Sequence, residues 1–257
     1  MNIPSRGLGS SRPSICQENL RDTSLQLHLM NERRECILRE HDFYVDQINQ
    51  RVIAQFQDME GEADRLTETE YKRLSGLYGH EDADPASIRD DAREHAIGHY
   101  QMLSDLKQQV ILGALAGLYH QWEKQFRGFV ERELMHYMTR DEVKKYAWPF
   151  NIGDVFDVVK HFGWDVRSQR FFKPIDACRV IVNVYKHGPG RSLDELAKEY
   201  PAYLPQMLTA RFSALGLRHI DHEWLTVTET DFAELAKGLR GFWEKLPEKL
   251  YLDQKSP

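Results

Sequence analysis

The sequence has few of the features that mark secreted, membrane-bound or metal-rich proteins. It contains only three cysteines in 257 residues, Cys16, Cys36 and Cys178. An odd number of widely separated cysteines implies neither a disulfide framework nor a zinc cluster, and it fits a reducing cytoplasm. No apolar run approaches the roughly 20 residues of a membrane span, and the N-terminus lacks the apolar core of a signal peptide. We therefore expect a cytoplasmic protein with no membrane segment.

The chain also lacks an excess of positive charge. It has 34 Lys and Arg against 40 Asp and Glu, a net charge of −6. This balance argues against non-specific coating of nucleic acid, although it allows a local basic site. The hydrophobic share of 41% and the charged share of 29% indicate a soluble globular protein that can bury a substantial core.

Composition divides the chain into three parts. Residues 1–14 are rich in Gly, Pro and Ser and are expected to form a disordered tail. Residues 15–80 are polar and helical in pattern, with a narrow apolar stripe at three- and four-residue steps. The stripe consists of Val45, Ile48, Val52, Phe56 and Met59. This stripe suits one partner helix, so the segment is predicted to be a helical arm, either an antiparallel hairpin or a dimerising element.

Residues 81–257 are predicted to form a mainly α bundle. A long helix should span residues 85–137, because Asp84 is a suitable N-cap and Pro85 suits the first helical position. Capping boxes at residues 139–142 and 192–195 should begin two shorter helices. Further short helices are expected after Asn151 and Lys173, and a last one over residues 231–246. Two β-prone runs at residues 217–220 and 224–228 predict a small hairpin.

One stretch of this bundle combines an apolar helix with a strip of polar side chains. Residues 179–188 read Arg-Val-Ile-Val-Asn-Val-Tyr-Lys-His-Gly. At about 100° per residue, four nitrogen-bearing side chains share one arc of roughly 100°. These residues, which we call the polar strip, are Arg179, Asn183, Lys186 and His187. The rest of the circumference is apolar, and Gly188 is expected to end the helix.

The polar strip and two other helices resemble the HEPN superfamily. The resemblance covers roughly residues 90–250 and is carried by residues 118–123 (Leu-Tyr-His-Gln-Trp-Glu), by the strip with the following Gly-Pro-Gly-Arg-Ser, and by residues 242–247 (Phe-Trp-Glu-Lys-Leu-Pro). HEPN proteins are four- to five-helix bundles, and many are metal-independent ribonucleases of toxin–antitoxin, abortive-infection and other antiphage systems. The resemblance implies this fold, with the arm as an addition to it.

The strip departs from the HEPN signature at one position. The signature is an Arg, usually followed by a polar residue such as Asn, with a His four to six residues beyond. Here Asn183 and His187 keep their spacing, but Val182 stands where the Arg is expected. Arg179 lies one turn earlier on the same face of the predicted helix.

The resemblance implies chemistry that needs no metal or cofactor. Cleavage of RNA by its own 2′-OH requires a base, an acid and cations that stabilise the phosphorane. His187 would transfer protons, Arg179 and Lys186 would bind phosphate oxygens, and Asn183 would orient the phosphate or the imidazole. Glu123 would hold Arg179 or His187. The alternative is that Arg179 pairs with Glu123 inside the bundle and that His187 only complements the helix dipole.

Two functions follow from these alternatives. The first is a HEPN-like ribonuclease of a toxin or defence system, with RNA as substrate, an active site shared across a homodimer, and an antitoxin or defence-system protein as partner. The second is a catalytically silent HEPN-like bundle that serves as an interaction or assembly module.

Other candidate sites have less support from the sequence. His95 and His99, with Glu94, have the spacing of two metal ligands on a helix, but no third ligand is evident. The loop at residues 188–192 precedes a helix N-terminus and could bind an anion, but the capping box at residues 192–195 favours a structural loop. Cys178 lacks a neighbouring base and is expected to be buried.

Overall fold

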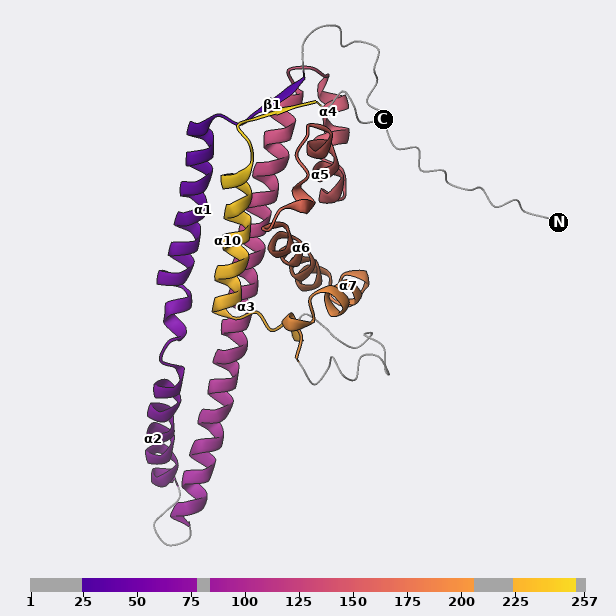
Figure 1. The fold of residues 1–257 in the computed structure, drawn as a ribbon. Coiled ribbons are helices and arrows are strands. Elements are labelled where there is room, and N and C mark those ends of the chain that lie inside the picture. The colour runs from indigo at the N-terminus through magenta and orange to yellow at the C-terminus, as the bar shows by residue number, and fades with distance from the viewer. Residues whose placement is uncertain (1–24, 78–83, 206–223, 253–257) are drawn as a thin grey trace, which may run out of the picture.

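The computed structural model describes residues 25–77, 84–205 and 224–252 (Figure 1). The predicted tail at residues 1–14 lies outside these ranges. The described chain is mainly α with one small antiparallel sheet, as the sequence predicted. Its elements are β1 (Gln26–His28), α1 (Asn31–Arg51), η2 (Ile53–Phe56), α2 (Met59–Leu77), α3 (Pro85–Leu134), α4 (Arg140–Ala147), α5 (Ile152–His161), η3 (Val166–Ser168), α6 (Phe172–His187), α7 (Arg191–Glu199), η4 (Pro201–Tyr203), α10 (Glu229–Lys245) and β2 (Lys249–Tyr251).

Helix α3 runs through the whole molecule. It has 50 residues and therefore spans about 75 Å at 1.5 Å per residue. Asp84 caps it by accepting a hydrogen bond from the Ala86 N–H at 3.0 Å, and Pro85 occupies the first turn, as predicted. The C-terminal half of α3 packs against α1, α6 and α10, whereas the first part of the helix runs beside α2 (Figure 1).

Aromatic side chains fill the core between α3, α5 and α10. The ring centroids of Trp122 and Phe126 lie 5.1 Å and 4.8 Å from that of Phe242, both edge-on. Phe156 stacks on Phe126 at 5.7 Å. All four side chains are at most 4% exposed. Edge-to-face pairs add about 0.5–1.5 kcal/mol to the burial of such rings, so this cluster fixes α10 and α5 on α3.

The predicted arm is in large part integrated with this core. Leu27, Leu29 and Ile37 are at most 1% exposed and belong to the same core cluster. Tyr44 of α1 donates a hydrogen bond to the Ala114 carbonyl of α3 at 2.9 Å, and its hydroxyl lies over Gly117. A side chain at position 117 would have to displace the Tyr44 hydroxyl from this contact between the two helices.

Helix α2 and the first part of α3 extend away from the body (Figure 1). Helix α2 has no buried residue and packs antiparallel along the N-terminal half of α3, which forms the hairpin that was one of the two predictions for the arm (Figure 1). The body reaches as far as Lys107 and Gln108 of α3, which contact Glu229 at 2.6 Å and the Leu225 carbonyl at 2.9 Å. The preceding residues of α3 and all of α2 form what we call the projecting hairpin.

The small sheet joins the two ends of the described chain. Strand β1 pairs antiparallel with β2, with Leu27 opposite Leu250. The sequence predicted a hairpin elsewhere, from residues 217–220 and 224–228. The first run lies outside the described residues, and the second forms no strand. Leu225 and Val227 of that run are instead buried in the core, which accounts for their alternating apolar pattern.

The caps of the shorter helices follow the sequence in part. Thr139 and Glu142 form the predicted capping box of α4, and Asn151 caps α5 through the Gly153 N–H at 2.9 Å. The capping box predicted at residues 192–195 is wrong, because α7 begins at Arg191 with Gly190 as its N-cap and without a side-chain cap. None of the helices in the described ranges combines the length and apolarity that a bilayer crossing requires.

A buried histidine at the α1–α10 interface should make stability depend on pH. His41 is 5% exposed, and burial, more than any nearby charge, lowers its pKa from the ordinary 6.5; Arg240 also lowers it, whereas Asp42 opposes the shift. Below about pH 6.5, His41 is therefore protonated in the unfolded chain but stays neutral in the folded chain until the pH reaches its lower folded-state pKa. Stability is fully present above about pH 6.5 and is lost as the pH falls toward the lower pKa, by up to about 1.4 kcal/mol per pH unit.

We expect His41→Gln to remove this dependence. Urea unfolding between pH 7.5 and 5 should show a smaller loss of unfolding free energy in His41→Gln than in the wild type. His95→Gln, a change on an exposed face of α3, is the control and should follow the wild type. Equal pH slopes in His41→Gln and the wild type would contradict the assignment.

Candidate functional site

The polar strip lies on α6, as the sequence predicted, and the apolar remainder of that helix is buried. Val180, Ile181 and Val184 are fully buried, and α6 packs on α3, α7 and α10. Gly188 ends the helix with a φ of 67°, a conformation that glycine adopts without strain. The helix therefore offers only its strip to ligands or to neighbouring side chains.

Arg179, the guanidinium of the strip, is held by two carboxylates. Its Nε donates to Asp176 at 2.8 Å, one turn earlier, and its Nη2 donates to Glu195 of α7. The Tyr200 hydroxyl completes the group by donating to the second oxygen of Asp176 at 2.7 Å. Burial opposes the charged form of Arg179, but the hydrogen bonds that Arg179 donates to Glu195 and Asp176 outweigh this effect, so the pKa of Arg179 is raised. We call these four residues the Arg179 network.

The network also explains why the predicted capping box on α7 does not form. Glu195 was expected to bond back to the start of its own helix. A hydrogen bond between two charged groups is roughly twice as strong as one between neutral groups, and the guanidinium of Arg179 lies within reach. Glu195 therefore ties α7 to α6 instead.

Glu123 does not contact the strip residue that was predicted to pair with it. Its Oε1 accepts two hydrogen bonds from Arg127, at 2.9 and 2.7 Å. Arg127 is 5% exposed and also donates to the carbonyls of Ala147 and Pro149, at 3.2 and 3.0 Å. Because a buried guanidinium needs a counter-charge, Glu123 serves Arg127 and thereby holds the end of α4 on α3. The expectation that Glu123 holds Arg179 or His187 is wrong.

The remaining strip residues are unengaged. Asn183 is half-buried, and Lys186 and His187 are exposed. None of the three forms a hydrogen bond or an ion pair with another residue of the described ranges. Val182, at the position where the HEPN signature has its Arg, is 1% exposed. A guanidinium at that position would face the core of this bundle and not the strip.

His120 of α3 is a neighbour of the strip that sequence reasoning did not include among the site residues. Burial lowers its pKa first, and the positive charge of Lys186 lowers it further. Its Nδ1 lies 3.9 Å from Glu123 Oε2. The i, i+3 spacing of His120 and Glu123 was the signal in the sequence, because it places both on one face of α3.

The weaker candidates acquire no site. His99 lies 2.9 Å from Glu62 of α2, and no group of three potential metal ligands occurs within the described residues. Cys178 is fully buried, and burial raises the pKa of its thiol far above the ordinary value. A thiol in that state is a poor nucleophile.

The Arg179 network predicts a measurable loss of stability when its cation is removed. Arg179→Ala leaves Asp176 and Glu195, both partly buried, without their counter-charge. We expect a loss of about 1–3 kcal/mol in the free energy of unfolding. Lys186→Ala removes an exposed charge from the same helix and should change it by less than about 0.5 kcal/mol.

Urea denaturation of the two variants beside the wild type measures this difference. Equal stabilities for Arg179→Ala and Lys186→Ala would mean that the network contributes nothing, and Arg179 would then be available to a ligand.

Comparison with known proteins finds no relative of this chain. No family model matches the chain, and neither does any curated protein or solved structure.

Proposed function

We propose that this protein is a catalytically silent HEPN-like helical bundle that acts as an interaction or assembly module. The observation that carries the proposal is the Arg179 network. The one guanidinium of the polar strip already has two carboxylates as partners, and its side chain is only 23% exposed. A phosphate would have to displace both carboxylates before Arg179 could stabilise developing negative charge.

The electrostatics of the strip support the same proposal. Arg179 with Asp176 and Glu195 carries a formal net charge of −1, so this end of the strip repels an anionic substrate. Within the described residues, Lys186 and His187 at the other end form no hydrogen bond or ion pair that would orient them. Metal-free phosphoryl chemistry depends on preorganised donors, and two unrestrained exposed side chains do not supply them.

The projecting hairpin is the proposed assembly element. Three apolar side chains of α3 in this hairpin, Ile97, Met102 and Leu106, are 49%, 65% and 52% exposed. Two helices alone bury little apolar surface, and a second hairpin packed against these side chains would complete a four-helix arrangement. We therefore propose a homodimer joined through the hairpins, in a reducing cytoplasm where Cys36 and Cys178 remain free thiols.

The ribonuclease is the second candidate. The observation in its favour is that Asn183, Lys186 and His187 lie on one face of α6 and have no hydrogen-bond or ion-pair partner among the described residues. His120 of α3 is close enough to Lys186 for the lysine charge to lower the His120 pKa. Such a cluster holds the proton donors and acceptors that cleavage through the 2′-OH needs.

An RNA cleavage assay decides between the two candidates. We expect purified wild-type protein to leave single-stranded and structured RNA intact over hours, with or without EDTA, because two carboxylates already pair with the Arg179 guanidinium. His187→Ala should then be indistinguishable from the wild type. His161→Ala, a second exposed histidine, is the matched control.

The opposite result would establish the ribonuclease. EDTA-resistant cleavage that leaves 2′,3′-cyclic phosphate ends, and that falls roughly 10²–10⁴-fold in His187→Ala but not in His161→Ala, would overturn the silent module.

Light scattering tests the homodimer. We expect the mass of a dimer at micromolar concentration, and at least a tenfold weaker dimer in the double variant Met102→Glu, Leu106→Glu, since a charge would be buried at the contact. Phe43→Glu alters an exposed side chain of α1, 67% exposed and outside the hairpin, and should leave the mass unchanged. A monomer in the wild type would remove the hairpin from the proposal.

A further inference from the structure

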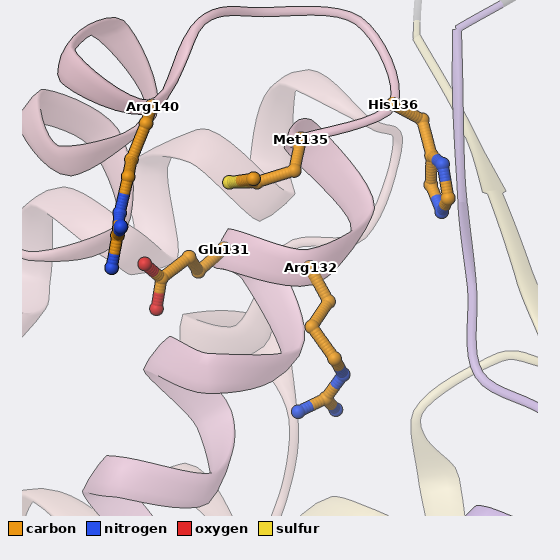
Figure 2. Close-up of a pocket in the computed structure, with 5 residues that line it drawn as sticks. All are labelled: Glu131, Arg132, Met135, His136 and Arg140. Carbon is orange, nitrogen blue, oxygen red and sulfur yellow. The ribbon is translucent and has the colours of Figure 1, made fainter.

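A hollow lies where α3 ends and α4 begins (Figure 2). Its volume is about 420 Å³, and it is lined by Glu131, Arg132, Met135, His136 and Arg140. Glu131 comes eight residues after Glu123 on α3, about 12 Å farther along the helix axis. The hollow is therefore separate from the polar strip and from the projecting hairpin.

The hollow carries more positive than negative charge. Arg132 and Arg140 are both exposed, and neither forms an ion pair with another residue in the described part of the chain. Burial lowers the pKa of Arg132, and the nearby cation Arg33 of α1 lowers it further, whereas Glu133 and Glu131 oppose the shift. Three guanidinium groups thus gather at this end of a protein whose net charge is −6.

The nearby carboxylates are occupied elsewhere. Glu131, the one acid in the lining, accepts a hydrogen bond from the indole N–H of Trp148 at 2.9 Å. Glu133 accepts one from the His28 N–H at 2.9 Å, and Glu142 accepts two from Thr139. These bonds hold the acids in structural roles, and within the described residues none of them forms an ion pair with Arg132 or Arg140.

The arrangement of the two arginines selects the kind of anion. Figure 2 shows the guanidinium groups of Arg140 and Arg132 well apart, on either side of the Glu131 side chain, with Met135 beside them. A single phosphate is bound best by donors that converge on it. Separated guanidinium groups beside an exposed apolar side chain suit an extended ligand that has two anionic groups and an apolar group.

The apolar surface of the hollow points to a protein ligand. Met135 of the lining is 48% exposed, and Trp148, which donates to Glu131 at the edge of the hollow, is 45% exposed. Exposed Met and aromatic side chains mixed with Arg are the composition of protein–protein contact surfaces. Complementary charge around such a surface sets both specificity and the rate of association.

We propose that this hollow binds an acidic peptide segment of a partner protein, with carboxylates on Arg132 and Arg140 and an apolar side chain on Met135. The inference rests on the interaction role proposed above and gives the chemistry of the partner. Carboxylates match the planar guanidinium forks, and the aliphatic stems of both arginines extend the apolar floor.

Selection from a random linear peptide display library tests the proposal with the full-length protein. Wild-type protein is the bait, and the double variant Arg132→Ala, Arg140→Ala is used to remove peptides that bind elsewhere. We expect the retained peptides to carry acidic residues together with an apolar one. Their affinity, measured by fluorescence polarisation, should fall about 3–10-fold in each single arginine variant and should weaken with added salt.

Matched variants separate the hollow from general charge effects. Arg93→Ala removes an exposed arginine from the projecting hairpin of the same helix and should leave peptide affinity unchanged, whereas Met135→Ala should lower it. Thermal denaturation should show wild-type stability in all four single variants, since their side chains are exposed. Retention of no acidic peptide, or equal binding by the double arginine variant, would overturn the proposal.

Two further outcomes bear on the ligand class. If single-stranded RNA or inorganic phosphate binds and is lost in the arginine variants while no acidic peptide is retained, the hollow is a phosphate site and the peptide proposal is wrong. Failure here is distinguishable from failure of the proposed function, because RNA cleavage is tested through His187 and dimerisation through Met102 and Leu106, none of which lines the hollow.

Discussion

The burial of the C-terminal half of α3 under aromatic rings is the contact on which the rest of the structure depends. Trp122 and Phe126 of α3 meet Phe242 of α10 edge-on, and the same rings receive Phe156 of α5. Burial of one such ring contributes about 1.5–3 kcal/mol before any edge-to-face attraction. With α10 fixed in this way, α1 and the β1–β2 sheet close over the same helix. Among the described residues, the first part of α3 packs with α2 and with no element of this aromatic core, so these two helices project from the body.

This constraint also determines what the polar strip can do. Because α6 lies against the core with its apolar surface, every polar group on it must use one narrow face. Asp176 lies at the start of that face, and α7 returns beside it with Glu195. Arg179 lies between these two carboxylates and pairs with both, which joins α6 to α7. A structural use of the guanidinium and a catalytic one exclude each other, and the side chains present favour the structural use.

The sequence was sufficient wherever local chemistry decided the outcome. The N-cap of α3, the capping box of α4 and the end of α6 at Gly188 follow from residues within one turn. The partners of charged residues did not follow, because they depend on tertiary placement. Nothing in the local sequence distinguishes Arg127, yet it is buried and pairs with Glu123. Glu195 pairs with Arg179 of another helix instead of capping its own helix. The small sheet was misplaced for a similar reason: buried loop residues such as Leu225 and Val227 alternate as strand residues do.

The two arginine environments of α3 and α4 show how burial separates structure from recognition. Arg127 is 5% exposed, and Glu123, the Ala147 and Pro149 carbonyls and the Trp148 ring occupy its guanidinium. Arg132, five residues later and beyond the aromatic cluster, is exposed and forms no ion pair within the described residues. The first arginine docks α4 on the bundle. Once α4 is docked, Arg140 in its first turn lies beside the end of α3, and the two exposed arginines line one hollow. The internal ion pair of Arg127 and Glu123 thereby positions the residues of the proposed peptide site.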